Sequence, residues 1–198
     1  MKRLITICAA VLFVAGTANA TPTVYNDRTA WETAVGSWTL ENFDDGILNP
    51  DVSVASQFGG AIQAGTGALG PDKVYYDRVT VPTSGGYTTT WSFATPLYAF
   101  GADWDLSGPG GPGTNLQLYL NGVIVGEEIL KSTAGTFWGL TNGPFDTILI
   151  AVGTASGAWA ETYEMDDMVY APIPAPGAIL LGSIGVGLVG WLRRRRTL

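Results

Sequence analysis

Residues 116–125 read LQLYLNGVIV, and this stretch decides the fold class more clearly than any other part of the chain. Two runs of strand-forming residues flank Asn121-Gly122, the dipeptide typical of a two-residue type I′ hairpin turn. A hairpin needs further strands to cover its apolar side. The stretch therefore predicts an antiparallel β environment around it.

Working outward from this hairpin, the rest of the domain repeats the same pattern. Eight further stretches are short, rich in β-branched or aromatic residues, and bounded by Gly, Pro or Asp. They cover residues 37–43, 52–58, 73–81, 87–93, 97–104, 136–140, 145–152 and 164–170. One helix is expected over residues 27–35, with Asn26 as its N-cap and Gly36 as its stop. About ten strands without βαβ alternation predict an all-β, jelly-roll-like, two-sheet β-sandwich over residues 21–170.

The first twenty residues have the features of a secretory signal peptide. A positive Met1-Lys2-Arg3 precedes an apolar run, and Ala18 and Ala20 stand before Thr21 at a cleavage position for signal peptidase. The single cysteine of the chain, Cys8, lies in this segment. The exported domain is therefore expected to be stable without disulfides.

Residues 171–198 form a tail with three parts in order. Prolines alternate at its start, residues 178–192 carry no charge, and a basic cluster follows at Arg193, Arg194, Arg195 and Arg196. A helix of fifteen residues reaches about 22 Å, less than the ~30 Å hydrocarbon core, so it would span only if the arginines snorkel. The positive-inside rule places these arginines in the cytoplasm and the domain outside. A permanent single-pass anchor is the alternative interpretation.

The tail resembles the PEP-CTERM sorting domain, in which a Pro-Glu-Pro motif precedes a short transmembrane run and an arginine cluster. Pro174, Ala175 and Pro176 occupy the motif here, with alanine in place of glutamate. The resemblance implies processing by an exosortase, at least transient residence in the inner membrane, and transfer to the cell envelope or extracellular matrix. Residues 100–104, 137–140 and 165–170 are similar to recurring strands in the β-sandwich domains that such proteins carry.

The charge of the domain excludes one class of partner. Six of the ten basic residues lie in the two targeting segments. Arg28, Lys73, Arg78 and Lys131 remain against seventeen acidic residues, a formal charge of −13. Such an acidic domain is not expected to bind nucleic acid.

Few residue types that carry out catalysis are present. The chain has no histidine, and no nucleophile-elbow, P-loop or dinucleotide motif occurs in it. Asp103 with Asp105, or Glu161 with Glu164, offers the carboxylate pair of a secreted carbohydrate-active hydrolase. The other interpretation is that these acids cap turns and lie at the surface. We expect a protein that is not an enzyme, with this hydrolase as the alternative.

Acidic residues at the first and last strands suggest a calcium site. Glu41, Asp44 and Asp166 resemble the calcium-binding positions of carbohydrate-binding modules, in which the terminal strands pair. A calcium-dependent adhesin or surface-layer unit is a further alternative. Charges that protect an edge strand from aggregation would explain the same residues without a metal.

Trp159 is the tryptophan most expected to be exposed, because small residues flank it in a loop-like stretch. An exposed indole can stack on the face of a sugar. The leading hypothesis is an exported, C-terminally sorted envelope or matrix protein whose sandwich binds polysaccharide or has a structural role.

Overall fold

The computed structural model describes residues 21–81, 83, 85–109, 113–154 and 158–173. The predicted signal peptide, the processing residues Pro174, Ala175 and Pro176, the helix over 178–192 and the arginine cluster lie outside these described residues. Within them, no helix has the length and apolar character needed to cross a membrane.

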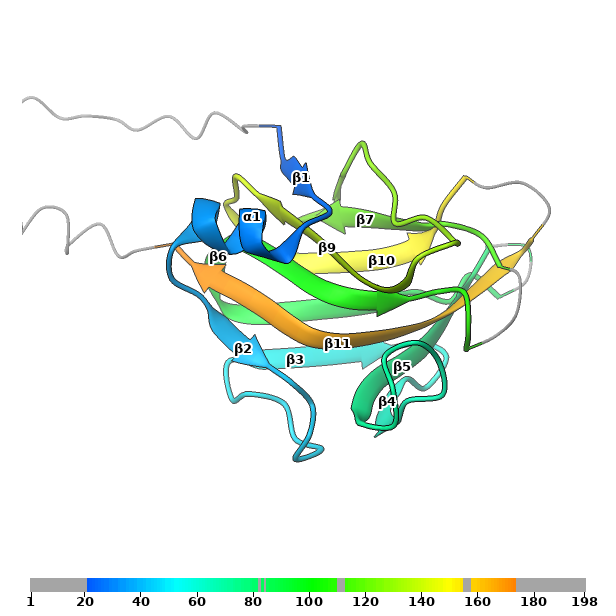
Figure 1. The fold of residues 1–198 in the computed structure, drawn as a ribbon. Coiled ribbons are helices and arrows are strands. Elements are labelled where there is room, and N and C mark those ends of the chain that lie inside the picture. The colour runs from blue at the N-terminus through cyan, green and yellow to red at the C-terminus, as the bar shows by residue number, and fades with distance from the viewer. Residues whose placement is uncertain (1–20, 82, 84, 110–112, 155–157, 174–198) are drawn as a thin grey trace, which may run out of the picture.

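The described part of the chain contains eleven strands and one helix (Figure 1). The elements are β1 (Thr23–Tyr25), α1 (Arg28–Val35), β2 (Thr39–Glu41), β3 (Val52–Ser56), β4 (Ala61–Ala64), β5 (Lys73–Thr80), β6 (Thr89–Asp105), β7 (Leu116–Leu120), β8 (Val123–Ile124), β9 (Ala134–Thr141), β10 (Phe145–Val152) and β11 (Ala160–Pro172). All strand pairs are antiparallel. The predicted all-β sandwich with one short helix is confirmed.

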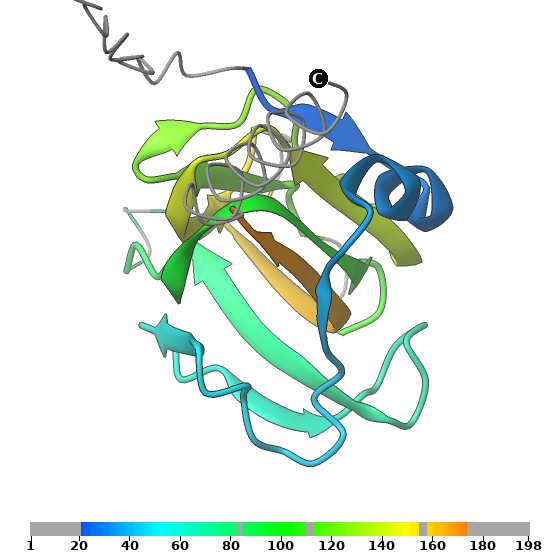
Figure 2. The same cartoon turned by 90° about the vertical axis from the view of Figure 1, so that its left-hand side faces the viewer.

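The two layers of the sandwich are joined through the long strand β6. Around Trp91, this strand pairs with β3 and β10, and around Trp104 it pairs with β11 and β9. One layer therefore runs β4-β5-β11-β6-β9-β1, with β2 beside the end of β11, and the other runs β3-β6-β10-β7-β8. Figure 2 shows the same strands after a 90° turn about the vertical axis. We call them the β11 layer and the β10 layer.

The predicted hairpin forms as expected. Asn121 and Gly122 have φ values of 48° and 80°, the two positive angles of a type I′ turn. Leu120 faces Val123 across it. The core between the layers is rich in aromatic residues, with Trp91, Trp104 and Tyr163 among its fully buried side chains.

Helix α1 covers the outer face of the β11 layer. Its N-cap is Asp27, whose side chain accepts the Ala30 N–H at 2.7 Å, so the expectation of Asn26 was wrong by one residue. Trp31 is fully buried, packs edge-on against Phe137, and donates a hydrogen bond to the Leu140 carbonyl. The ring of Phe137 occupies the space where a side chain at Gly101 or Gly139 would project.

Several predicted strand boundaries differ from the structure. The stretches 87–93 and 97–104 are one strand, because β6 bends at the exposed residues 94–96 without leaving the sheet. Strands β1 and β4 were not predicted, since three or four residues carry too little periodicity to be recognised. Strand β11 begins four residues earlier than predicted and continues through Pro172, two residues past the expected domain end.

Candidate functional site

The structure pairs the terminal strands as the calcium hypothesis requires, but it does not gather the three acids around one point. Glu41 faces Met168 across β2 and β11, and its carboxylate accepts the N–H groups of Phe43 and Asn49. Asp44 is exposed and bonds the side chain of Asn42 at 2.7 Å.

The third acid, Asp166, accepts the N–H of Asp167, also at 2.7 Å. Among the described residues, no group of three or more His, Cys, Asp or Glu side chains is arranged to hold a metal ion. The geometry therefore gives calcium binding no support.

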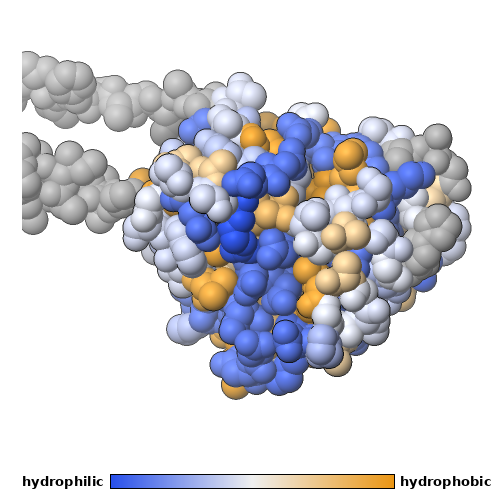
Figure 3. All heavy atoms as spheres, in the orientation of Figure 1, coloured by the Kyte–Doolittle hydropathy of each residue, from blue (hydrophilic) through white to orange (hydrophobic). Residues whose placement is uncertain are grey.

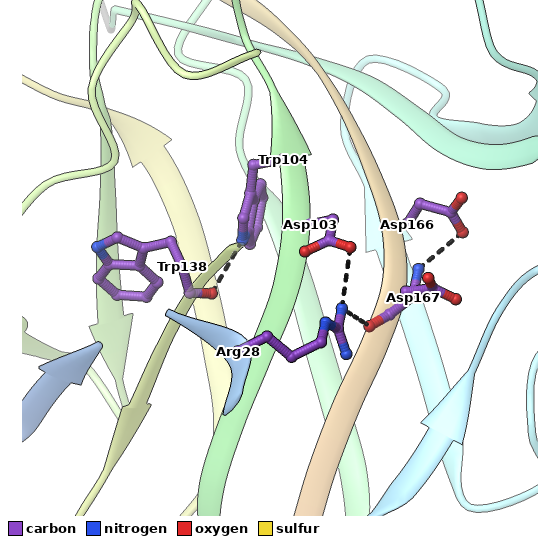
Figure 4. A network of polar contacts seen from close by, with 6 residues as sticks. All are labelled: Arg28, Asp103, Trp104, Trp138, Asp166 and Asp167. Atoms are coloured by element: carbon purple, nitrogen blue, oxygen red, sulfur yellow. Dashed lines mark hydrogen bonds and ion pairs between the residues drawn. The ribbon is translucent and has the colours of Figure 1, made fainter. Parts of the chain in front are cut away.

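Arg28 joins α1 to the centre of the β11 layer (Figure 4). Its Nη2 lies 3.1 Å from Oδ2 of Asp103 on β6 and donates to the carbonyl of Asp167 on β11 at 2.9 Å. Its guanidinium also lies 4.8 Å from the ring centre of Phe137. Asp167 has a φ of 44° at a bulge in β11, which helps direct this carbonyl to the arginine. Arg28 thus ties the helix to two strands.

Acids outnumber the cation around Arg28. Burial raises the pKa of Asp103, and the Arg28 charge opposes this shift. Burial also raises the pKa of Asp166 to about 6. The hydrogen bond from the Asp167 N–H opposes this shift, and the negative charges of Asp167, Asp44 and Asp103 add to it. The face that carries α1 and β11 shows a hydrophilic band across its middle (Figure 3). We interpret this cluster as structural, since Arg28 is already occupied by its own chain.

The carboxylates proposed for hydrolysis are paired differently from the prediction. Asp105 and Glu164 lie opposite each other on β6 and β11, and both are fully buried. Glu164 accepts from Thr66 and from the N–H of Gly67, while Asp105 accepts from Ala68, Ser107 and the N–H of Gly108. These two acids hold the loops between β4 and β5 and after β6.

Among the described candidate acids, Glu161 is the one with a buried carboxylate oxygen that has no hydrogen-bond partner. Its Oε2 is buried without a hydrogen-bond partner, and only 1% of the residue is exposed. Burial raises its pKa to about 8, against the opposing N–H of Thr162 and the charge of Lys131. A raised pKa suits a general acid, but neither predicted pair lies as an open pair of carboxylates, and the geometry gives the hydrolase hypothesis no support.

Trp159 lies in a group of aromatic side chains around Arg78. The Arg78 guanidinium is 5.0 Å from the Trp159 ring centre and 5.7 Å from that of Phe58. Tyr87 packs edge-on against Phe58 at 5.6 Å between centroids. Trp159 is 54% exposed and Phe58 is 47% exposed. We call Phe58, Arg78, Tyr87 and Trp159 the aromatic–arginine platform.

Antiparallel pairing of β5 with β11 builds this platform. Arg78 faces Thr162 in the register, which places it near Trp159 just before β11 begins. Because Tyr75 and Val79 of β5 face the core, Arg78 points to the outer face. The Val81 N–H donates to the Trp159 carbonyl at 2.9 Å and fixes the indole-bearing segment against the end of β5.

The charge of Arg78 has no ionic partner within the described part of the chain. The single ion pair found there joins Arg28 to Asp103. The Nε of Arg78 is buried and has no hydrogen-bond partner among the described residues. The neighbouring Asp77 is buried and accepts from Ser56, Tyr75 and Thr89.

A groove of about 790 Å³ beside β7 and β9 is the main alternative site. Part of its polar lining is bonded within the groove, because Glu128 accepts from Asn115 and Thr154. Trp138 in the groove is only 3% exposed, so it offers little ring face for stacking. The platform is the better candidate for a ligand that stacks.

Sequence reasoning found Trp159 but missed Phe58, Arg78 and Tyr87. The four residues of the platform are separated by 20, 9 and 72 positions along the chain, so no local motif connects them. The period-two pattern of residues 73–81 would have placed Arg78 on the side of β5 opposite Tyr75 and Val79. The pairing of β5 with β11 was not readable from the sequence.

Comparisons with known proteins provide no family. No family model matches the chain, and no curated protein matches it. A solved structure, described as the catalytic unit of a thermostable GH87 alpha-1,3-glucanase from Streptomyces thermodiastaticus strain HF3-3, is similar with a TM-score of 0.35 and 13% identity. The likeness covers 63% of this chain and 26% of that one, so this chain spans about a quarter of the glucanase unit. This distant likeness carries no functional argument.

Proposed function

We propose that this chain is an exported, C-terminally sorted protein of the cell envelope or extracellular matrix whose β-sandwich binds polysaccharide. The sorting part rests on the signal-peptide pattern and on the PEP-CTERM-like order of residues 171–198. The binding part rests on one observation, the aromatic–arginine platform with its two half-exposed rings.

The platform has the properties that a sugar-binding surface needs. The C–H face of a pyranose is apolar, so it gains by covering an aromatic ring, while its hydroxyls need polar partners at the edge. Trp159 and Phe58 provide the rings, and the guanidinium of Arg78 provides hydrogen-bond donors between them. Their mutual contacts hold the rings in place before binding, which lowers the entropy lost on association.

The proposal is for binding without catalysis. Asp103 is engaged by Arg28, and Asp105 and Glu164 are buried acceptors for loop N–H groups. These acids therefore serve the fold.

Affinity electrophoresis of the full-length protein in gels containing neutral and acidic soluble polysaccharides tests the binding proposal. We expect Trp159→Ala to weaken retention by up to about tenfold, because one aromatic stacking contact is worth about 0.5–1.5 kcal/mol. Trp38→Ala is the matched control, since Trp38 is also exposed but lies in a hollow beside α1 and the end of β11. Equal retention of the wild type and the Trp159 variant in every gel would refute the proposed site.

The sorting proposal has a separate test in a host that contains an exosortase. The expected product begins at Thr21, ends near Pro176 and is found outside the inner membrane. A product that retains Arg193–Arg196 in the inner membrane would show that the tail is a permanent anchor.

A further inference from the structure

We infer that the aromatic–arginine platform selects an acidic sugar, one bearing a carboxylate, and that Arg78 is the residue that recognises it. This inference rests on the proposed function, because it names the class of polysaccharide that the same site would bind.

The cation of Arg78 has no acidic partner among the described residues. The domain has four basic residues among seventeen acids, so an acidic partner for any arginine is abundant. Arg28 has taken such a partner, Asp103, at 3.1 Å. Arg78 has none among the described residues, and its side chain makes only the two contacts with aromatic rings.

The guanidinium group of Arg78 is fixed in orientation and accessible to a ligand. Contacts with Phe58 and Trp159 restrict the guanidinium plane, and the burial of Nε shows that the stem is packed. Arg78 as a whole is only partly buried. A planar arginine fork in a fixed orientation is matched to a carboxylate, which accepts two parallel N–H bonds.

A uronic acid presents an apolar face and a carboxylate on one sugar ring. Its apolar face can cover Trp159 or Phe58, while the carboxylate at its edge meets the guanidinium beside them. A neutral sugar would satisfy the rings but would leave the charge of Arg78 without a counterion. Charge complementarity therefore favours the acidic sugar.

Two acids near the platform in the sequence, Asp77 and Glu161, do not cancel this preference. The side chain of Asp77 is directed to the core side of β5, where hydroxyl groups bond its carboxylate. Glu161, two residues after Trp159, has a pKa of about 8 because of burial, so it is mostly uncharged at neutral pH. The wider negative charge of the domain is screened beyond about 8 Å at physiological salt. Short acidic oligosaccharides should therefore suffer less repulsion than long polymers.

A matched pair of probes separates charge from stacking. Short oligogalacturonates and the same oligomers with their carboxyl groups methyl-esterified share one sugar backbone, and esterification replaces each carboxylate charge by an uncharged methyl ester. We would titrate both into the full-length wild-type protein at neutral pH and about 0.15 M salt by calorimetry, and repeat the titrations with Arg78→Gln, Trp159→Ala and Lys73→Gln. Lys73 lies on the same strand and is exposed, so its variant removes one charge away from the platform.

The wild type should bind the acid form about tenfold more tightly than the ester, the difference expected for a charge-assisted hydrogen bond. Arg78→Gln should abolish this difference while retaining ester binding, and Lys73→Gln should keep it. Trp159→Ala should weaken both probes. Equal affinity of the wild type for the acid and the ester would overturn the preference for an acidic sugar but leave the sugar-binding proposal intact. If neither probe binds, the preference and the sugar-binding proposal are both overturned. Melting curves of each variant exclude unfolding as the cause.

Discussion

Arg28 and Arg78 make the same kind of contact with aromatic rings and have opposite surroundings. Arg28 lies 4.8 Å from the centre of Phe137, and Arg78 lies 5.0 Å from that of Trp159. Arg28 also bonds Asp103 and a carbonyl of β11, whereas Arg78 has no acid partner in the described part of the chain. Contact with an aromatic ring is therefore not enough to assign a role to an arginine. The partner that neutralises its charge assigns the role, and for Arg78 we propose that this partner is an acidic ligand.

The tryptophans beside the two arginines differ in the same way. Trp31, three residues after Arg28, is fully buried and bonds the Leu140 carbonyl. Trp159, beside Arg78, is 54% exposed. One region uses an arginine and a tryptophan to fasten a helix to a sheet, and the other presents the same two residue types to solvent.

The largest effect is expected from Trp31→Ala. Removing a fully buried indole leaves a cavity between α1 and the β11 layer, so the free energy of unfolding should fall by about 3–5 kcal/mol. Urea unfolding followed by circular dichroism measures it. Trp159→Ala should change the same quantity by less than about 0.5 kcal/mol, since exposed substitutions are usually near neutral. Comparable losses for the two variants would break the comparison.

Arg28→Gln should have an intermediate effect. It leaves Asp103 without its cation and one carbonyl of β11 without its donor, and we expect about 1–2 kcal/mol of destabilisation. The same urea titration measures the change. An Arg28→Gln, Asp103→Asn double variant should lose less than the sum of the two single variants, because both changes remove one contact. If the loss of unfolding free energy in the double variant equals the sum of the two single losses, Arg28 and Asp103 do not interact.

The pH dependence of stability should reveal the buried acid beside the platform. Glu161 has a folded pKa of about 8 against an ordinary value of 4.5, so the folded state keeps a proton that the unfolded state has released. Stability contributed by this proton is therefore lost as the pH rises from about 5 through about 8. Thermal melts of the wild type should show Tm falling across this window, and those of Glu161→Gln should show a smaller fall. Parallel profiles would contradict the raised pKa.

The smallest effect is expected from metal removal. Glu41, Asp44 and Asp166 bond separate groups of their own chain. Adding EDTA or calcium should therefore leave the melting temperature unchanged in calorimetry. A calcium-dependent rise that Asp166→Asn removes would restore the calcium hypothesis.

Local signals predicted the fold better than they predicted the site. The Asn121-Gly122 turn, the alternating strands and the stop of α1 at Gly36 depend on neighbours within a few residues, and the structure has them all. The site depends on strand pairing between distant segments, which one sequence does not specify. The alternative hydrolase hypothesis paired Asp105 with Asp103, whereas the register sets Asp105 opposite Glu164. Phe58 gave no signal, because an aromatic residue at a strand end is ordinary.

Paired measurements on Arg28→Gln and Arg78→Gln test the central claim most directly. Each full-length variant would be assayed for its free energy of unfolding and for its affinity for short oligogalacturonates. We expect Arg28→Gln to lower the free energy of unfolding and to leave the affinity of the folded protein unchanged. We expect Arg78→Gln to lower the affinity about tenfold and to change the free energy of unfolding by less than about 0.5 kcal/mol. If Arg78→Gln instead lowers stability as Arg28→Gln does and leaves affinity unchanged, both arginines are structural and the platform is not a binding site.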